Sequence, residues 1–448
     1  MTYAESLEYL AFLGHELHGV EFRLETTYTI LAVLGNPHLK CPTAIIAGTN
    51  GKGSTSAMLA SILRQAGYRT GLYTSPHLIR INERIAVDGA EISDEEFARA
   101  LSSVKDAVER LLADKSLEKR PSFFEVVTAV AFLHLAQAQV DFAVLEVGMG
   151  GRLDATNVTE PRVAVITNIE LDHQEFLGAT HAAIAREKAG VIKPGRPVIS
   201  GCAHPEAAAV IRQRCAELGA PLIETRTLGQ FLNLRNSQGR YEFDYALNGD
   251  LFSNLISPLL GQFQVDNVAA AVAAAWQLRA QGFAIDQTAI DAGLRLASWP
   301  GRLDTICDQP LVLLDGAHNP AGAREVARFV RECLAGRKLR LVFASMRDKS
   351  FAEMSEMLFP LAAEVYLTRP PHPRAASPEE VLAAAPRKPD RPIIEPDPER
   401  ALSRAVEASS PDDVVLVAGS LFLVGAIKKT IRSGGLHVLK SPGSGARA

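Results

Sequence analysis

Short apolar runs alternate with helical segments through the first half of the chain. Apolar runs that end at glycine or at polar residues are typical of buried strands, and such runs occur at 43–48, 69–75, 140–148 and 162–170. Helical spacing marks two further segments, 54–67, which stops at a C-capping Gly67, and 122–139, which reads as a long amphipathic helix. Strands that alternate with helices predict a parallel sheet whose ligands gather at the carboxyl ends of the strands.

The pattern changes near residue 226 and returns to the α/β rhythm after residue 301. Residues 241–261 alternate around Asn248-Gly249, which predicts a hairpin. An Ala-rich helix follows from residue 267, and Trp299-Pro300-Gly301 has the composition of a linker. Further apolar runs predict strands of a second sheet, at 311–316, 339–345, 364–370 and 413–420.

These patterns predict an α/β protein of two domains. A chain of 448 residues is long for a single core. We expect a P-loop-type, mainly parallel sheet domain over 1–298, a linker at 299–301, and a smaller Rossmann-like α/β domain over 302–438. The Ser/Gly-rich segment 439–448 is expected to be a disordered tail.

The composition indicates a globular protein and gives no reason to expect a nucleic-acid or membrane partner. Hydrophobic residues make up 47% and charged residues 22% of the chain, which is typical of a globular protein. A net charge of −4 gives no reason to expect a nucleic-acid partner. No apolar run reaches a membrane span, no basic start suggests a secretory signal, and five scattered cysteines fit a reduced, cytoplasmic protein.

The loop GTNGKGST (48–55) joins the first predicted strand to a helix. Its glycines let backbone N–H groups converge on an anion, and Lys52 can neutralise phosphate. Ser54 or Thr55 can cap the helix and approach a metal ion. The extra Gly53 breaks the usual G-x-x-x-x-G-K-[ST] spacing. A nucleotide site is favoured over a tight turn with an N-cap.

Three further groups follow strands or lie on a nearby helix. Glu146 ends a buried strand, where it can hold Mg²⁺ or pair with Arg152. His173, beside Asp172 after the next strand, is either a second metal ligand or a structural histidine. Lys188 lies on a helix, where a lone lysine is usually solvated.

The second predicted domain carries its own polar cluster. The strand 311–316 ends in Asp315, and His318 and Asn319 precede Pro320, a residue suited to the first turn of a helix. The cluster can bind ribose or phosphate, or it can be a capping turn.

Taken together, the motifs resemble the Mur ligase superfamily and, within it, the folylpolyglutamate synthase/dihydrofolate synthase family of bifunctional bacterial type. The resemblance spans almost the whole chain. In that family the loop reads G-T-N-G-K-G-[ST], so Gly53 favours the folate branch over the muramyl-peptide branch. The carrying stretches are GTNGKGST (48–55), YTSPHL (73–78), INERI (81–85), FFE (123–125), LEVGMGGRLDATN (145–157), ITNIELDH (166–173), IAREKAGVIK (184–193), QVDNVAAA (264–271), PGRLD (300–304) and DGAHNP (315–320).

The resemblance implies an ATP-dependent ligase that adds L-glutamate to dihydropteroate, to reduced folates, or to both, through an acyl phosphate. It implies Mg²⁺, with a monovalent cation as a further candidate, and a monomer. It also implies catalytic roles for Lys52, Lys188 (carbamylated) and His318. The remaining implied contacts are ATP with Gly51, Lys52, Gly53, Ser54, Asn267, Arg302 and Asp315, metal with Ser75, Glu146 and His173, and the pterin or folate with Ser122, Leu153, Asp154 and Ala155.

Three alternatives stay open at this point. The enzyme can be a monofunctional folylpolyglutamate synthase, or a Mur-type ligase with another acceptor. From another class of protein, a P-loop switch or kinase with a regulatory second domain would turn over nucleotide without glutamate.

Overall fold

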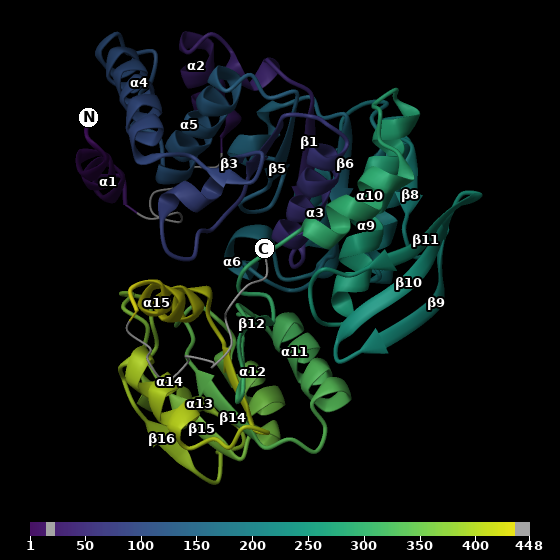
Figure 1. Ribbon diagram of the computed structural model, residues 1–448. Coiled ribbons are helices and arrows are strands. Elements are labelled where there is room, and N and C mark those ends of the chain that lie inside the picture. Colours follow the sequence, from purple (N-terminus) through teal and green to yellow (C-terminus); the bar gives the residue numbers. More distant parts are fainter. Residues whose placement is uncertain (15–22, 435–448) are drawn as a thin grey trace.

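The computed structural model describes residues 1–14 and 23–434. They form a large α/β unit, a small antiparallel sheet at its side, and a second α/β unit (Figure 1). The mixed α/β class with mainly parallel sheets is therefore confirmed. The domain boundaries stay a prediction, and the expected disordered tail lies outside the described residues.

The first unit is built on an eight-stranded sheet with the order β4-β3-β2-β5-β1-β6-β7-β8. The six strands β2, β5, β1, β6, β7 and β8 run parallel. At the edge, β3 pairs antiparallel with β2, and β4 pairs antiparallel with β3. The carboxyl ends of β1, β5 and β6 thus meet at one edge. The strands are β1 (Thr43–Ala47), β2 (Thr70–Tyr73), β3 (Ile85–Val87), β4 (Ala90–Glu91), β5 (Phe142–Glu146), β6 (Val163–Ile166), β7 (Val198–Ser200) and β8 (Leu222–Glu224).

Helices cover both faces of this sheet. On one face α3 and α9 pack with α10, and the other face is shared by α1, α2, α4 and α5 near β2 and by α7 and α8 near β6 and β7. The bounds are α1 (Tyr3–Phe12), α2 (Leu24–Val33), α3 (Lys52–Gln65), α4 (Asp94–Ala113), α5 (Phe123–Gln137), α6 (Gln174–Leu177), α7 (His181–Lys188), α8 (Pro205–Glu217), α9 (Phe263–Ala280) and α10 (Gln287–Leu296), with 3₁₀ turns at Pro37–Leu39, Ile81–Arg84, Ala155–Val158 and Ala189–Val191.

Two helices differ from the sequence prediction. The helix α5 is not amphipathic, because its residues from Val126 to Leu135 are all buried between the sheet and its neighbouring helices. The helix α3 begins at Lys52, two residues earlier than expected, because Gly51 in the left-handed region (φ 82°) turns the chain directly from the loop into the helix.

The predicted hairpin forms and gains a third strand. Strands β10 (Arg240–Leu247) and β11 (Asp250–Ile256) pair antiparallel around Asn248 and Gly249, both with positive φ. The strand β9 (Gly229–Ser237) pairs with β10 on the other side. Its side chains are mostly exposed, so the apolar pattern that predicts strands is weak there.

The second unit is a six-stranded sheet with the order β12-β13-β17-β14-β15-β16, in which β12 alone is antiparallel. Its strands are β12 (Asp304–Asp308), β13 (Leu311–Leu314), β14 (Leu339–Phe343), β15 (Glu364–Leu367), β16 (Pro392–Ile394) and β17 (Val414–Ala418). The helices are α11 (Pro320–Cys333), α12 (Phe351–Leu358), α13 (Pro378–Ala384), α14 (Pro398–Glu407) and α15 (Leu421–Arg432), with a 3₁₀ turn at Phe359–Leu361. Asn319, in the segment that follows β13, donates a hydrogen bond to Asp172 of the first unit, so residues 315–320 lie at the junction of the two units. Across residues 1–14 and 23–434, we find no helix with the length and apolar character needed to cross a membrane.

Candidate active site

The loop between β1 and α3 requires glycine at three positions. A Cβ on Gly48 would lie 1.9 Å from Thr167 Oγ1, and one on Gly51 would lie 2.2 Å from Asn267 Oδ1. A Cβ on Gly53 would lie 2.6 Å from the ring of Trp299, which belongs to the predicted linker. The extra glycine therefore makes room for an aromatic ring that packs on the loop.

The prediction that Ser54 or Thr55 caps the helix α3 is wrong. Gly51 is the N-cap of α3 and has no side chain, whereas Ser54 and Thr55 lie inside the first turn. Because no side chain caps this end, the first N–H groups of α3 are left for a ligand. Lys52 donates from Nζ to Thr49 O at 3.2 Å, and burial lowers the pKa of its ammonium, against the opposing charges of Glu146 and Asp172.

Glu146 is buried at the end of β5 and is 4% exposed. Its Oε2 accepts a hydrogen bond from Ser75 N at 3.1 Å, and burial raises its pKa to about 7 although the charge of Lys52 opposes that shift. Arg152 pairs with Glu187 at 3.0 Å, so the alternative of a Glu146–Arg152 ion pair is wrong.

Lys188 is buried as well, so the solvated alternative is wrong. The residue is 4% exposed at the end of α7, and its Nζ donates to Gly48 O, at the start of the phosphate loop, at 2.7 Å. Burial and the nearby charge of Lys52 lower the pKa of its amine to about 7.

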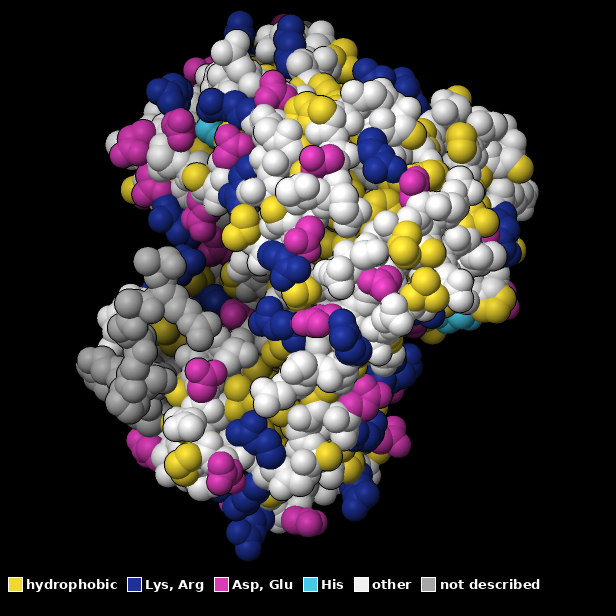
Figure 2. All heavy atoms as spheres, turned by 45° about the vertical axis from the view of Figure 1, so that its right-hand side comes forward, with side chains coloured by type: hydrophobic (Ala, Val, Ile, Leu, Met, Phe, Trp, Pro, Cys, Tyr) yellow, Lys and Arg dark blue, Asp and Glu magenta, His cyan; other side chains and the backbone are white. Residues whose placement is uncertain are grey.

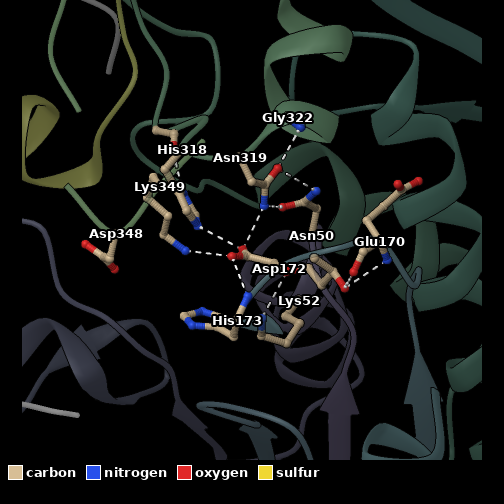
Figure 3. A network of polar contacts seen from close by, with 12 residues as sticks. Asn50, Lys52, Glu170, Asp172, His173, His318, Asn319, Gly322, Asp348 and Lys349 are labelled. Atoms are coloured by element: carbon tan, nitrogen blue, oxygen red, sulfur yellow. Dashed lines mark hydrogen bonds and ion pairs between the residues drawn. The ribbon is translucent and has the colours of Figure 1, made fainter. Parts of the chain in front are cut away.

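A polar network joins the two units beside the loop (Figure 3). Asp172, which follows β6, accepts hydrogen bonds from Lys349 Nζ at 2.7 Å and from Asn319 Nδ2 at 2.9 Å. Its Oδ2 lies 3.8 Å from His318 Nε2. Burial alone would raise the pKa of Asp172, but the charge of Lys349 and the hydrogen bond that it donates hold that pKa well below its usual value.

The same network reaches the phosphate loop. Asn319 Nδ2 donates to Asn50 Oδ1 at 3.0 Å (Figure 3). Asn50 N donates in turn to Asn168 Oδ1 at 2.7 Å. Asn319 also caps α11 by accepting from Gly322 N at 2.8 Å, so the capping reading of this turn is correct and coexists with a place in the site.

Two histidines of the site are kept neutral by burial. His173 stands in the left-handed region (φ 51°), and burial lowers its pKa to about 4. Burial and the charge of Lys349 likewise lower the pKa of His318 to about 4. His318 Nδ1 lies 2.8 Å from Gly316 O, and because a carbonyl only accepts, Nδ1 carries the proton and Nε2 is left as an acceptor.

Asp315 and Arg302 lie where β12 and β13 meet the linker. The carboxylate of Asp315 is buried and accepts from Leu303 N and Ala317 N, both at 2.8 Å, and burial raises its pKa. Arg302 Nη1 donates to Gly301 O at 3.0 Å.

The candidate acceptor residues are held by turns. Ser122 caps α5 and exchanges hydrogen bonds with Glu125. Asp154 is 5% exposed and accepts from Thr156 N at 3.0 Å and from Met149 N at 2.9 Å. The turn between β5 and β6 is thereby fixed around a buried carboxylate.

One cavity of about 420 Å³ brings these groups together. Figure 2 shows basic and acidic side chains gathered along the junction of the two units. Every residue to which the family resemblance gives a role lines this cavity: Gly51, Lys52, Gly53, Ser54, Ser75, Ser122, Glu146, Leu153, Asp154, Ala155, His173, Lys188, Asn267, Arg302, Asp315 and His318. Thr55 and Asn319, which the residue pattern also offered as candidates, are not among the lining residues. Sequence reasoning missed Lys349, for which no local motif stands out, and it did not assign roles to Asn50 and Asp172 although their motifs were noticed.

Comparison with known proteins assigns the family. The Mur ligase middle domain matches residues 46–275, and the Mur ligase glutamate ligase domain matches residues 301–421. The dihydrofolate synthase/folylpolyglutamate synthase of Bacillus subtilis is 35% identical, over 94% of this chain and 97% of that protein. The chain belongs to this family of Mur ligases. It is therefore an ATP-dependent ligase.

Solved structures of the family agree over the whole fold. E. coli FolC in complex with DHPP and ADP superposes with a TM-score of 0.86 at 30% identity, and covers 97% of this chain and 99% of its own. Mycobacterium tuberculosis folylpolyglutamate synthase complexed with ADP and AMPPCP gives a TM-score of 0.88 at 31% identity, with 95% and 98% coverage.

Proposed function

We propose that this ligase adds L-glutamate to dihydropteroate, making dihydrofolate, and to reduced folates, making polyglutamates. The observation that carries the proposal is the single cavity in which the phosphate loop, the buried Glu146 and the Asp154 turn face residues of the second unit. The names of relatives with both activities support the bifunctional form.

The phosphate loop would hold the triphosphate of ATP. The N–H groups of residues 51–54 and the ammonium of Lys52 supply positive charge at one end of the cavity. Asn267, Arg302 and Asp315 would contact the nucleotide from α9 and from the second unit.

The donor set fits Mg²⁺. Glu146 and Ser75 offer oxygen atoms, and within the described residues no group of three or more acidic, histidine or cysteine side chains could hold a metal alone. Mg²⁺ commonly binds one or two carboxylates together with substrate phosphates, so a sparse protein set suits it. Glu146, Ser75 and His173 would hold the ion, which neutralises phosphate charge when bound. A monovalent cation remains a further candidate.

The reaction has two steps. An oxygen of the acceptor carboxylate attacks the γ-phosphorus, the bond to ADP breaks, and an acyl phosphate forms. The neutral amine of glutamate then attacks the acyl carbon, the acyl–oxygen bond breaks, and inorganic phosphate leaves with a proton from the amine as the amide forms. The residues act by positioning and by charge neutralisation. Ser122, Leu153, Asp154 and Ala155 would bind the acceptor, and His318 would lie near the phosphates.

An acceptor-exchange assay tests the proposal. Purified protein receives ATP, Mg²⁺ and glutamate with dihydropteroate, with a reduced folate, or with a muramyl-peptide acceptor, and phosphate release and amide formation are both measured. We expect turnover with the first two acceptors. Turnover with the reduced folate alone would indicate the monofunctional enzyme, and turnover with the muramyl peptide alone would indicate another Mur ligase. Release of phosphate that ignores glutamate would favour a switch or kinase.

We also propose a monomer that works in the cytoplasm. The scattered cysteines are all free, which suits a reducing compartment. Light scattering on the purified protein tests the monomer, since a mass near twice 48.2 kDa would contradict it.

A further inference from the structure

Asp172 has no role in the proposed reaction, yet its carboxylate contacts Lys349, Asn319 and His318 of the second unit. Its carboxylate is 10% exposed and lies on the loop after β6, in the first unit. Its two oxygens accept from Lys349, after β14, and from Asn319, before α11. These partners come from separate loops of the second unit, so a single side chain holds both loops against the first unit (Figure 3).

The contact continues into the phosphate loop. Asn319 and Asn50 face each other as an amide pair, with Nδ2 to Oδ1 distances of 3.0 and 3.3 Å. Thr167 Oγ1 donates to Asn50 O at 2.6 Å, which ties the same loop to the end of β6. The loop, the strand end and the second unit therefore form one connected set of hydrogen bonds.

We propose that Asp172 is a positioning residue that clasps the second unit onto the phosphate loop through Lys349 and Asn319. The carboxylate is charged and the lysine is 12% exposed, and charge-assisted hydrogen bonds of this kind are stronger than neutral ones. Asn319 also hydrogen-bonds to Asn50 of the phosphate loop, so displacement of the second unit would break that contact as well.

The clasp has a consequence for the acyl phosphate, and this step rests on the proposed function. An acyl phosphate is consumed either by the amine of glutamate, which gives the amide, or by water, which wastes ATP. Closing the junction brings the two halves of the cavity together and excludes water. Loss of the clasp should therefore raise the phosphate released per amide formed.

The experiment compares Asp172→Asn, Asp172→Glu and Lys349→Met with wild type, using phosphate release and amide formation in the same reaction. We expect Asp172→Asn and Lys349→Met to raise the phosphate-to-amide ratio at least about threefold and to lower kcat/KM for glutamate about tenfold or more. Combining Asp172→Asn with Lys349→Met should change the phosphate-to-amide ratio little further, because each substitution alone already breaks the clasp. Asp172→Glu, which keeps the charge, should restore part of the coupling.

A control variant separates the clasp from a general loss of ion pairs. Glu224→Gln removes a carboxylate that binds Arg212 at 2.8 and 3.0 Å entirely within the first unit, and it should leave the ratio unchanged. A merely structural role of Asp172 would lower the melting temperature and total activity without changing the ratio. An unchanged ratio in Asp172→Asn, or an equal rise in Glu224→Gln, would overturn the proposal.

Solution X-ray scattering tests the clasp without any catalytic readout. Asp172→Asn and Lys349→Met should have a larger radius of gyration than wild type and Glu224→Gln. Equal radii in all four proteins would overturn the clasp even if turnover changed. If wild type shows no acceptor-dependent phosphate release, the proposed function fails, and the scattering result still decides the clasp.

Discussion

Burial prepares Lys188 for carbamylation. Only the neutral amine adds to carbon dioxide, giving a carbamate and a proton. With a pKa of about 7, roughly half of the Lys188 side chains are neutral at pH 7, whereas at the ordinary value of 10.5 about one in 3,000 would be. The burial of this side chain thus raises the reactive fraction about 1,500-fold. The product would replace an ammonium by a carboxylate beside Gly48 in the phosphate loop.

The sign of the pH dependence follows from the lowered pKa. Above about pH 7 the amine is neutral and reacts, and below it the amine is protonated and does not. Carbamate should therefore decline as the pH falls through 7. Protein in ¹³C-bicarbonate should show a carbamate resonance by carbon-13 NMR with that pH dependence. The resonance should vanish in Lys188→Ala and persist in Lys193→Ala, a matched control whose partly buried Nζ donates to Asn157 O at 3.1 Å.

Activity gives the second measurement. Lys188→Ala should lower kcat at least about 100-fold. Adding short carboxylates should restore part of the lost kcat, and this rescue should not need bicarbonate. The variant leaves Gly48 O without its buried donor, which costs about 1–3 kcal/mol of stability, so the melting temperature is measured alongside. Full activity in Lys188→Ala, or no carbamate resonance in an active wild type, would refute the reasoning.

Substitutions at three further positions of the site, with one compensating change at Trp299, test other parts of it. Lys52→Ala should lower kcat/KM for ATP about 10–100-fold. The melting temperature should change little, because burying the charge of Lys52 destabilises the fold when no phosphate is bound. Unchanged ATP kinetics would contradict the loop assignment. Gly53→Ala should raise the KM for ATP, since its methyl group would overlap the ring of Trp299; a smaller ring in Trp299→Leu should relieve this, and no relief would exclude the clash. Glu146→Gln should raise the Mg²⁺ concentration for half-maximal rate about 10–100-fold, and an unshifted Mg²⁺ titration would remove Glu146 from the metal set.

Local patterns were enough to predict the mainly parallel fold and the strand ends that line the cavity. The apolar runs before Gly48, Glu146 and Asp315 are buried strands because both faces of each sheet are covered by helices. The strands β9 and β12 were not predicted because their exposed residues interrupt the apolar pattern. The strands β3, β4, β7, β8 and β16 were not predicted either, because two or three residues are too few to show a pattern. A window of sequence also cannot tell whether a helix such as α5 is covered on one side or on all sides.

The parts of the site that depend on distant contacts could not be predicted from spacing. The buried Lys188 contacts Gly48, 140 positions away, and only the family resemblance singled the lysine out. Lys349 and Asp172 meet across 177 positions, and their pairing depends on how the second unit docks. Periodicity describes elements one at a time, so it carries no information on such docking.

The packing of Trp299 on Gly53 gives the enzyme a built-in optical probe. The chain has two tryptophans, and the other, Trp276, lies on α9 with its indole N–H bonded to Asp250. Replacing Trp276 by phenylalanine would leave one indole, seated on the first turn of α3 and covalently part of the segment between the sheets. Its emission should respond to nucleotide in the loop and to rotation of the second unit, so both events could be timed in unlabelled protein.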